Sequence, residues 1–68
     1  MISITNSSNI LGIHYDSSNF FLEVTFKNGT VYRYLDIPKE IYETFLVSPS
    51  KGKFLHENIK KFKHFRVK

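Results

Sequence analysis

The stretch Phe-Phe-Leu-Glu-Val-Thr-Phe-Lys-Asn-Gly-Thr-Val-Tyr-Arg-Tyr-Leu, residues 20–35, decides the fold. Residues 20–26 alternate in side-chain character, as a strand with one face on a core does. A second run of strand composition, residues 30–35, follows the turn pair Asn28-Gly29. Two such runs on either side of Asn-Gly predict a β-hairpin.

The turn of this hairpin decides which side chains face the core. A two-residue Asn28-Gly29 turn would place Val24 opposite Arg33 and so mix apolar and charged side chains. A three-residue loop with Gly29 in a left-handed bulge gives compatible pairs throughout: Val24 with Tyr32, Leu22 with Tyr34, and Glu23 with Arg33. We favour the bulged turn, which makes both tyrosines mainly structural. A role in stacking on RNA bases is their alternative.

The residues on either side of the hairpin extend the predicted fold. Residues 10–15, between two turn-rich Ser-Ser-Asn segments, have the composition of a strand. After the hairpin, Asp36 is placed to cap a helix, and Pro38 is tolerated in its first turn. Ser48-Pro49 repeats this start signal and predicts a second helix from about residue 49 to residue 61.

The complete prediction is an α+β fold. A three-stranded antiparallel sheet from residues 10 to 35 is followed by two helices that cover one face of it. Residues 63–68 alternate, and two structures remain open for them: a short fourth strand at the sheet edge, or a loose tail. With 68 residues, the chain is expected to form a single domain, residues 1–68, without a deep cavity.

The composition narrows the class of protein and its compartment. Hydrophobic residues make up 41% of the chain and aromatic residues 16%, which is typical of a chain that folds. The chain has no cysteine, which excludes disulfides and thiolate catalysis and fits a reducing compartment. Its apolar runs fall far short of the roughly 20 residues of a membrane span. We therefore predict a cytoplasmic protein with no membrane partner.

Charge is distributed unevenly along the chain, whose formal net charge is +4. Residues 48–68 carry seven bases against the single acid Glu57, which gives +6, whereas residues 1–47 carry three bases against five acids, which gives −2. Folding does not require this separation, so the basic end indicates a polyanionic partner. A solvated lysine-rich tail is the alternative.

Residues 48–53 are the first candidate for contact with a polyanion. Lys51 and Lys53 fall in the first turn of the predicted second helix, against the positive end of the helix dipole. Gly52 lowers helix propensity by about 1 kcal/mol relative to alanine. A bound phosphate would reverse the charge conflict, with Ser50 as a further donor. The alternative is that Gly52 permits close packing while the lysines point into water.

Residues 60–66 are the second candidate, because they interleave bases with aromatic rings. Cations neutralise phosphates, while exposed rings stack on unpaired bases. Phe62 continues the apolar side of the helix and is predicted to lie in the core, whereas Phe65 lies beyond the helix and is a candidate for stacking. The complete predicted interface comprises Ser50, Lys51, Gly52, Lys53, Lys60, Lys61, Lys63, Phe65 and Arg66.

We predict no catalytic residues, no metal site and no cofactor. His56-Glu57 begins like the zincin motif, but Lys60 stands where the second histidine ligand must be. The three histidines share no ligand spacing, and the acids are scattered singly, so the sequence does not support metal ligation or paired-carboxylate chemistry. Its serines do not lie in a nucleophile elbow. We therefore predict that the protein is not an enzyme.

Several short motifs, taken in order, resemble the KTSC domain, a module that stands alone in bacteria or forms the C-terminal part of some lysyl-tRNA synthetases. The resemblance covers nearly the whole chain and rests on Ser8-Asn9-Ile10, Tyr15-Asp16, Leu22-Glu23-Val24-Thr25-Phe26 with Asn28-Gly29, Tyr32-Arg33-Tyr34, Ile37-Pro38 leading to Tyr42, and Ser50-Lys51-Gly52-Lys53-Phe54 with Ile59. Leu55-His56 departs from a commoner Phe-Asn. The resemblance implies a small shared fold and, through the synthetase, an association with RNA.

These observations predict a small non-catalytic module that binds nucleic acid through a basic C-terminal surface, with RNA favoured over DNA. The alternative is a protein-interaction module that recruits an acidic partner or pairs through its sheet edge. The sequence leaves the oligomeric state open.

Overall fold

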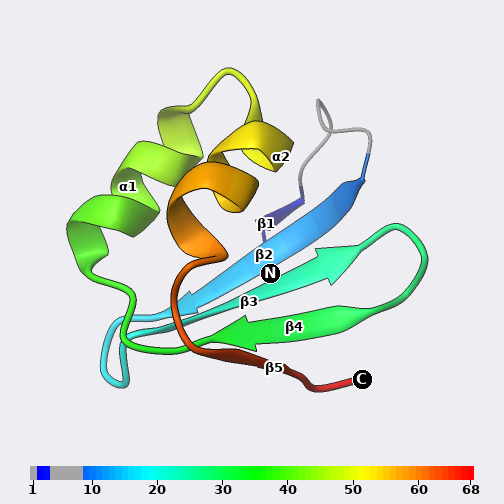
Figure 1. Cartoon of the computed structure of the whole chain (residues 1–68), viewed down its shortest axis with the longest axis horizontal. Coiled ribbons are helices and arrows are strands. Elements are labelled where there is room, and N and C mark those ends of the chain that lie inside the picture. The colour runs from blue at the N-terminus through cyan, green and yellow to red at the C-terminus, as the bar shows by residue number, and fades with distance from the viewer. Residues whose placement is uncertain (1, 4–8) are drawn as a thin grey trace.

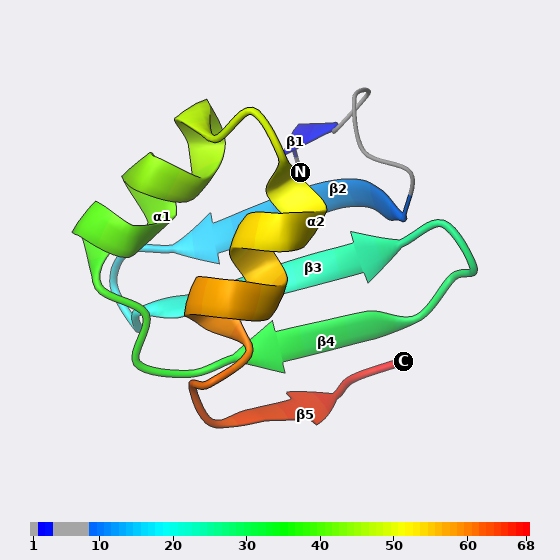
Figure 2. The same ribbon diagram turned by 45° about the horizontal axis from the view of Figure 1, so that its top comes forward.

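The computed structural model describes residues 2–3 and 9–68 of the chain. An antiparallel sheet of five strands, in the order β1-β2-β3-β4-β5, carries the helices on one face (Figures 1 and 2). The elements in chain order are β1 (Ile2–Ser3), β2 (Ile10–Asp16), β3 (Phe21–Phe26), β4 (Val31–Tyr34), α1 (Lys39–Val47), α2 (Lys51–Phe54), the π-helical turn η1 (Leu55–Ile59) and β5 (His64–Arg66). The fold is α+β, as predicted.

Both outer strands extend the three-stranded sheet that the sequence predicted. β5 pairs with β4, which confirms the short C-terminal strand over the loose tail. β1 pairs with β2, with Ile2 opposite Ile13 and Ser3 opposite Gly12, and was not predicted. Every strand therefore lies beside its nearest strand in the sequence.

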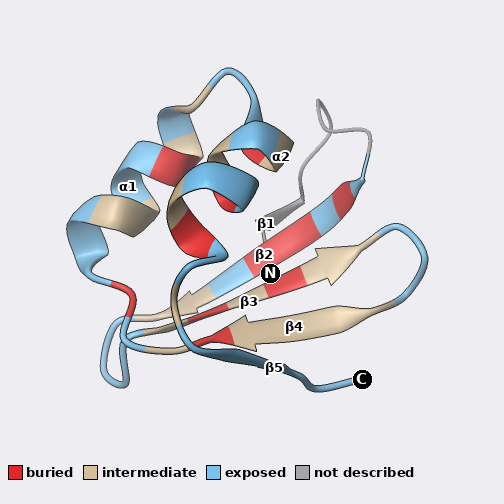
Figure 3. Cartoon of the chain, in the orientation of Figure 1, coloured by how far each residue is buried: buried red, intermediate tan, exposed pale blue. Residues whose placement is uncertain are grey.

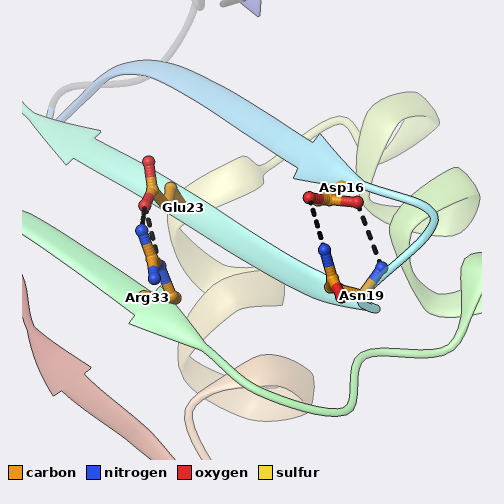
Figure 4. A network of polar contacts seen from close by, with 4 residues as sticks. All are labelled: Asp16, Asn19, Glu23 and Arg33. Atoms are coloured by element: carbon orange, nitrogen blue, oxygen red, sulfur yellow. Dashed lines mark hydrogen bonds and ion pairs between the residues drawn. The ribbon is translucent and has the colours of Figure 1, made fainter.

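The β3–β4 hairpin has the bulged turn that the sequence favoured. Its register pairs Leu22 with Tyr34, Glu23 with Arg33, and Val24 with Tyr32. Gly29 has a φ of +91°, the left-handed conformation that glycine adopts without a steric penalty. On the face away from the helices, Arg33 Nε donates a hydrogen bond of 2.8 Å to Glu23 Oε2, and a terminal nitrogen of Arg33 donates to the same oxygen (Figure 4).

Helix α1 begins at Lys39, and the prediction that Asp36 caps it was wrong. Asp36 has a φ of +56°, and Pro38 occupies the N-cap position without a side-chain hydrogen bond. The reason lies in the proline, because a residue that precedes proline is excluded from helical conformation. Ile37 therefore lies outside the helix, and its amide donates to the Phe20 carbonyl at 2.8 Å. This bond ties the start of α1 to the β2–β3 turn.

The second helix begins two residues later than predicted and changes its form along its length. Ser50 is extended (φ −130°, ψ 95°), and the helix starts at Lys51. From Leu55 it continues as the π-helical turn η1, in which Lys60 N donates to Leu55 O at 2.8 Å. Such turns are rare and often occur at functional sites. Leu55 and Ile59 are buried, as their spacing predicted.

The core lies between the sheet and the helices (Figure 3). Its fully buried side chains come from every layer: Ile10, Ile13, Leu22, Val24, Ile37, Phe45 and Ile59. Phe62, predicted to be core, is partly buried and packs against this cluster. Among the described residues, no helix has the length and apolar character needed to cross a membrane.

Candidate nucleic-acid interface

A hollow of about 390 Å³ separates the second helix from the sheet beneath it. The helix contributes one side of it, and strands β2, β3, β4 and β5 contribute the other. Its lining residues are Asn9, Ile10, Phe26, Tyr32, Tyr34, Gly52, Leu55, His56, Lys60 and His64. Four of these side chains are aromatic rings from the helix-facing side of the sheet.

A second hollow, of about 500 Å³, lies at the end of the sheet formed by the β3–β4 turn. It is lined by Asn9, Phe26, Lys27, Asn28, Thr30, Tyr32 and Arg66. Asn9, Phe26 and Tyr32 line both hollows, which are therefore neighbours. We call the two together the aromatic groove.

The rings of the groove are in mutual contact. The centroids of Tyr34 and His64 are 4.9 Å apart, and those of Tyr32 and His64 are 6.1 Å apart. Phe26 meets Tyr32 at 6.0 Å with an interplanar angle of 82°. Tyr34 is 4% exposed, and its burial, followed by the neighbouring Tyr32, raises the pKa of its phenol above the usual value. Tyr32 is more accessible, being half-buried.

The bulged turn explains why these rings share one face. Because side chains alternate along a strand, the pairing of Val24 with Tyr32 turns Tyr32 and Tyr34 toward the helices. The register of β5 places His64 opposite Tyr34 and Arg66 opposite Tyr32, so these two side chains join the same face. The structural role predicted for the tyrosines is confirmed for Tyr34, whose ring belongs to the core.

The charges along the groove are positive. Lys60 lines the first hollow, and Lys27 and Arg66 line the second, whereas no carboxylate is among the described residues that line either one. Arg66 Nε donates to the Lys68 carbonyl at 3.1 Å, which leaves its terminal nitrogens for other partners. The groove can therefore attract an anion.

Two histidines add polar groups to the first hollow. His64 Nδ1 lies 2.8 Å from the Phe62 carbonyl oxygen. A carbonyl can only accept a hydrogen bond, so Nδ1 carries the proton, and the other ring nitrogen, Nε2, is left as an acceptor in the neutral ring. His56 projects from the opposite side, on η1.

Three of the predicted interface residues line the groove: Gly52, Lys60 and Arg66. Lys51 does not, and its prediction as an exposed phosphate ligand is corrected. Its side chain is 8% exposed, and Nζ donates to the Ser48 carbonyl at 2.8 Å. Ser50 is exposed, and its carbonyl accepts a hydrogen bond from the Ser48 hydroxyl at 3.1 Å. Lys51 therefore stabilises the start of its own helix.

The other predicted residues are exposed but lie outside the groove. Lys53, Lys61 and Lys63 are exposed side chains that line neither hollow. Phe65 is 45% exposed, but the β5 register places it opposite Arg33, on the face of the sheet away from the helices. The structure thus places the ring of Phe65 on the opposite face of the sheet from Arg66, one of the cations that were predicted to act with it.

The face away from the helices holds a second cluster, centred on Arg33. The guanidinium carbon of Arg33 lies 4.4 Å from the Phe21 ring centroid and 5.9 Å from that of Phe65. Glu23 holds the same guanidinium. Because Glu23 neutralises the charge of Arg33, this cluster attracts anions less than the groove does.

The sequence prediction missed much of the groove, namely Lys27 and the rings of Phe26, His56 and His64. The alternation of residues 20–26 and 63–68 contained the signal for two of them, Phe26 and His64. Their convergence could be inferred only after β5 was placed beside β4. Within the described part of the chain, no three His, Asp or Glu side chains are gathered as a metal site requires.

The fold and the groove define a class of protein: a small α+β module with a concave surface that is aromatic and positively charged. Residues 6–65 match the KTSC domain, and the chain belongs to this family. The crystal structure of a KTSC domain protein from Yersinia pestis superposes with a TM-score of 0.91 at 36% sequence identity, over 97% of this chain and 93% of that one.

Two related sequences place the family in different proteins. An uncharacterised protein from Stutzerimonas stutzeri is 33% identical over 60 residues, which cover 88% of this chain and 83% of the relative. A lysine–tRNA ligase from Trichormus variabilis is 39% identical over 51 residues, which cover 74% of this chain and 9% of the ligase. The chain thus corresponds to a small segment of that ligase.

Proposed function

We propose that this protein is a non-catalytic RNA-binding module and that the aromatic groove is its binding surface. The observation that carries the proposal is the lining of the groove, in which Lys27, Lys60 and Arg66 accompany aromatic rings and no carboxylate among the described residues. Cations neutralise phosphates, and rings contact bases, so this combination suits a nucleic acid. The similarity to part of a lysine–tRNA ligase favours RNA over DNA.

The exposed lysines outside the groove have a secondary part in this proposal. Lys53, Lys61 and Lys63 add to a net charge of +4 and so attract a polyanion at long range. They accelerate the encounter with RNA, whereas Lys60 and Arg66 make the contacts of the bound state. The two groups of cations can be distinguished by mutation.

The test measures binding of a fluorescein-labelled RNA by anisotropy at several KCl concentrations. The logarithm of the binding constant should fall linearly with the logarithm of the salt concentration, with a slope of about 0.7 to 0.9 per phosphate contact. Lys60→Gln and Arg66→Gln should each reduce the slope by about that amount. Lys53→Gln, which removes one charge outside the groove, is the matched control and should leave the slope nearly unchanged. Salt-independent binding, or equal effects of all three substitutions, would refute the proposal.

Protein interaction is the second candidate function, and the cluster around Arg33 favours it. Phe65 is exposed there beside an arginine whose charge Glu23 balances, on a sheet face that lies away from the helices. Aromatic and arginine side chains are enriched at protein interfaces. A partner captured from nuclease-treated lysate by the wild type and by Lys60→Gln, but not by Phe65→Ser, would support this function over RNA binding.

A further inference from the structure

We infer that the groove binds an unpaired segment of RNA, with a base stacked on Tyr32, and that it discriminates against duplexes. This inference rests on the proposed function, because it names the form of RNA that the same groove takes.

Tyr32 has no parallel neighbour among the described residues. Its ring meets Phe26 at 82°, His64 at 69° and Tyr34 at 38°, so none of these rings stacks on it. Tyr15 shows the contrast, since its ring lies 4.3 Å from that of Tyr42 at 13°, a stacked pair. Tyr32 also lines both hollows. A planar base can therefore take the position of a stacked neighbour on the Tyr32 ring.

The cations lie in the two hollows that Tyr32 lines. Lys60 belongs to the first hollow, whereas Lys27 and Arg66 belong to the second. A strand whose base stacks on Tyr32 has one phosphate before that base and one after it. The groove thus offers positive charge to both phosphates, which suits a continuous strand of at least two nucleotides better than a single free nucleotide.

A donor and an acceptor for a base edge are also present. Asn28 Oδ1 accepts a hydrogen bond of 3.0 Å from the Thr30 amide, which orients the side-chain amide and leaves its NH₂ group for a ligand. On the other side, His64 Nε2 is an acceptor in the neutral ring, because Nδ1 is held by the Phe62 carbonyl. An unpaired base exposes the edges that such groups recognise.

In a duplex the phosphates are accessible to the cations of the groove, but the faces of the bases are not accessible to its rings. In a duplex each base is stacked between its neighbours and paired along its edge, so Tyr32 has no base face to contact. Binding of a duplex would depend on charge alone. The preference for single strands should therefore come from the rings and should remain when salt weakens the electrostatic contribution.

The experiment compares a 12-nucleotide single-stranded RNA with the same sequence in a duplex, at one salt concentration. We expect the single strand to bind at least about fivefold more tightly, the smallest change that one base stack produces. Tyr32→Leu should remove most of that difference, and Tyr32→Phe should retain it. Phe65→Leu is the matched control, because it removes an exposed ring from the opposite face of the sheet and should change neither affinity.

A single strand that contains 2-aminopurine reports stacking directly, without a variant. Its fluorescence should fall on binding to the wild type and to Tyr32→Phe, and should change little with Tyr32→Leu, whose fold is checked by circular dichroism. Equal affinities for single strand and duplex, or unchanged fluorescence on binding, would overturn this inference and leave the proposed function standing. Failure of both RNAs to bind would refute the proposed function itself.

Discussion

Lys51 is hydrogen-bonded to Ser48, the residue three positions before it, with Nζ 2.8 Å from the Ser48 carbonyl oxygen. The bond closes the connection between α1 and α2 with a lysine that is 8% exposed. Lys51→Met keeps the length of the side chain and removes the donor, so we expect a loss of about 1 kcal/mol in the free energy of unfolding. Urea denaturation measures it.

The exposed Lys53 provides the comparison within the same helix. Lys53→Met should change the stability by no more than about 0.5 kcal/mol, as surface substitutions commonly do. Lys51→Met should also leave the salt dependence of RNA binding unchanged. If Lys51→Met lowered the salt slope of RNA binding and left the stability unaltered, Lys51 would be a residue of the binding surface.

Replacement of two glycines by alanine should change the stability of the protein in opposite directions. Gly29 has a φ of +91°, and Gly52 lies in α2, yet a Cβ at either position would meet no atom within 4 Å. Gly29→Ala therefore changes backbone strain alone and should cost about 1 kcal/mol of stability. Gly52→Ala should raise stability by roughly 0.4 to 1 kcal/mol, because alanine is the better helix former. Urea midpoints that shift in the same direction would contradict this account.

The burial of Tyr34 makes stability sensitive to alkaline pH. Burial raises the pKa of its phenol above the usual value of 10.0, so the unfolded chain loses this proton first. The resulting stability is fully present below about pH 10 and is lost as the pH rises through the folded-state pKa. Tyr34→Phe removes this dependence.

The stability difference between wild type and Tyr34→Phe should therefore be constant from pH 8 to about pH 9 and should shift in favour of the variant above pH 10. Lysines titrate in both proteins, so their effect cancels in the difference. Parallel curves up to pH 11 would show that the Tyr34 phenol ionises equally in both states. Urea titrations at each pH give the measurement.

Asp16 should contribute stability that disappears in acid. Its carboxylate accepts hydrogen bonds from the Asn19 side chain and from the Asn19 amide, both at 3.1 Å (Figure 4). It also accepts one from the Ser18 amide at 2.9 Å. The side-chain bond from Asn19 is the largest cause that lowers the pKa of Asp16 below 3.8. The stabilisation is present above about pH 4 and is lost as the pH falls through the folded-state pKa.

Asp16→Ala should therefore be less stable than the wild type at pH 7, and the two should converge in acid. Ser17→Ala, in the same turn, is the control and should track the wild type throughout. Thermal unfolding from pH 7 to pH 2 checks both curves. A gap that persists unchanged at pH 2 would assign the effect of Asp16→Ala to something other than its charge.

The hairpin could be predicted in detail because its constraints are local. The alternation of residues 20–26 and the Asn28-Gly29 pair leave few registers, and the match of Glu23 with Arg33 selects one. The start of α1 was missed although its signal is also local, since Pro38 excludes Ile37 from the helix. Asp36 has a side chain that suits a helix cap, but the backbone restriction on the residue before Pro38 determines where the helix begins.

The groove could not be predicted, because it depends on contacts between distant segments. Lys60 and Arg66 were identified from composition, but Tyr32 becomes part of the same surface only through the β3–β4 register and the return of β5. The burial of Lys51 likewise depends on how the connection after α1 bends back. Charge counts along a sequence do not contain that information.

The order of the sheet also bears on how the groove is assembled. β2, β3 and β4 are joined by short turns, whereas both helices lie between β4 and β5 in the sequence, so that pairing β5 with β4 costs more chain entropy. We expect the amide hydrogens of β5 to exchange with solvent sooner than those of the central strands. Amide exchange requires β5 to separate from β4, and because β5 supplies His64 and Arg66, each separation would remove these two side chains from the groove. A bound ligand would therefore slow the exchange of the β5 amides.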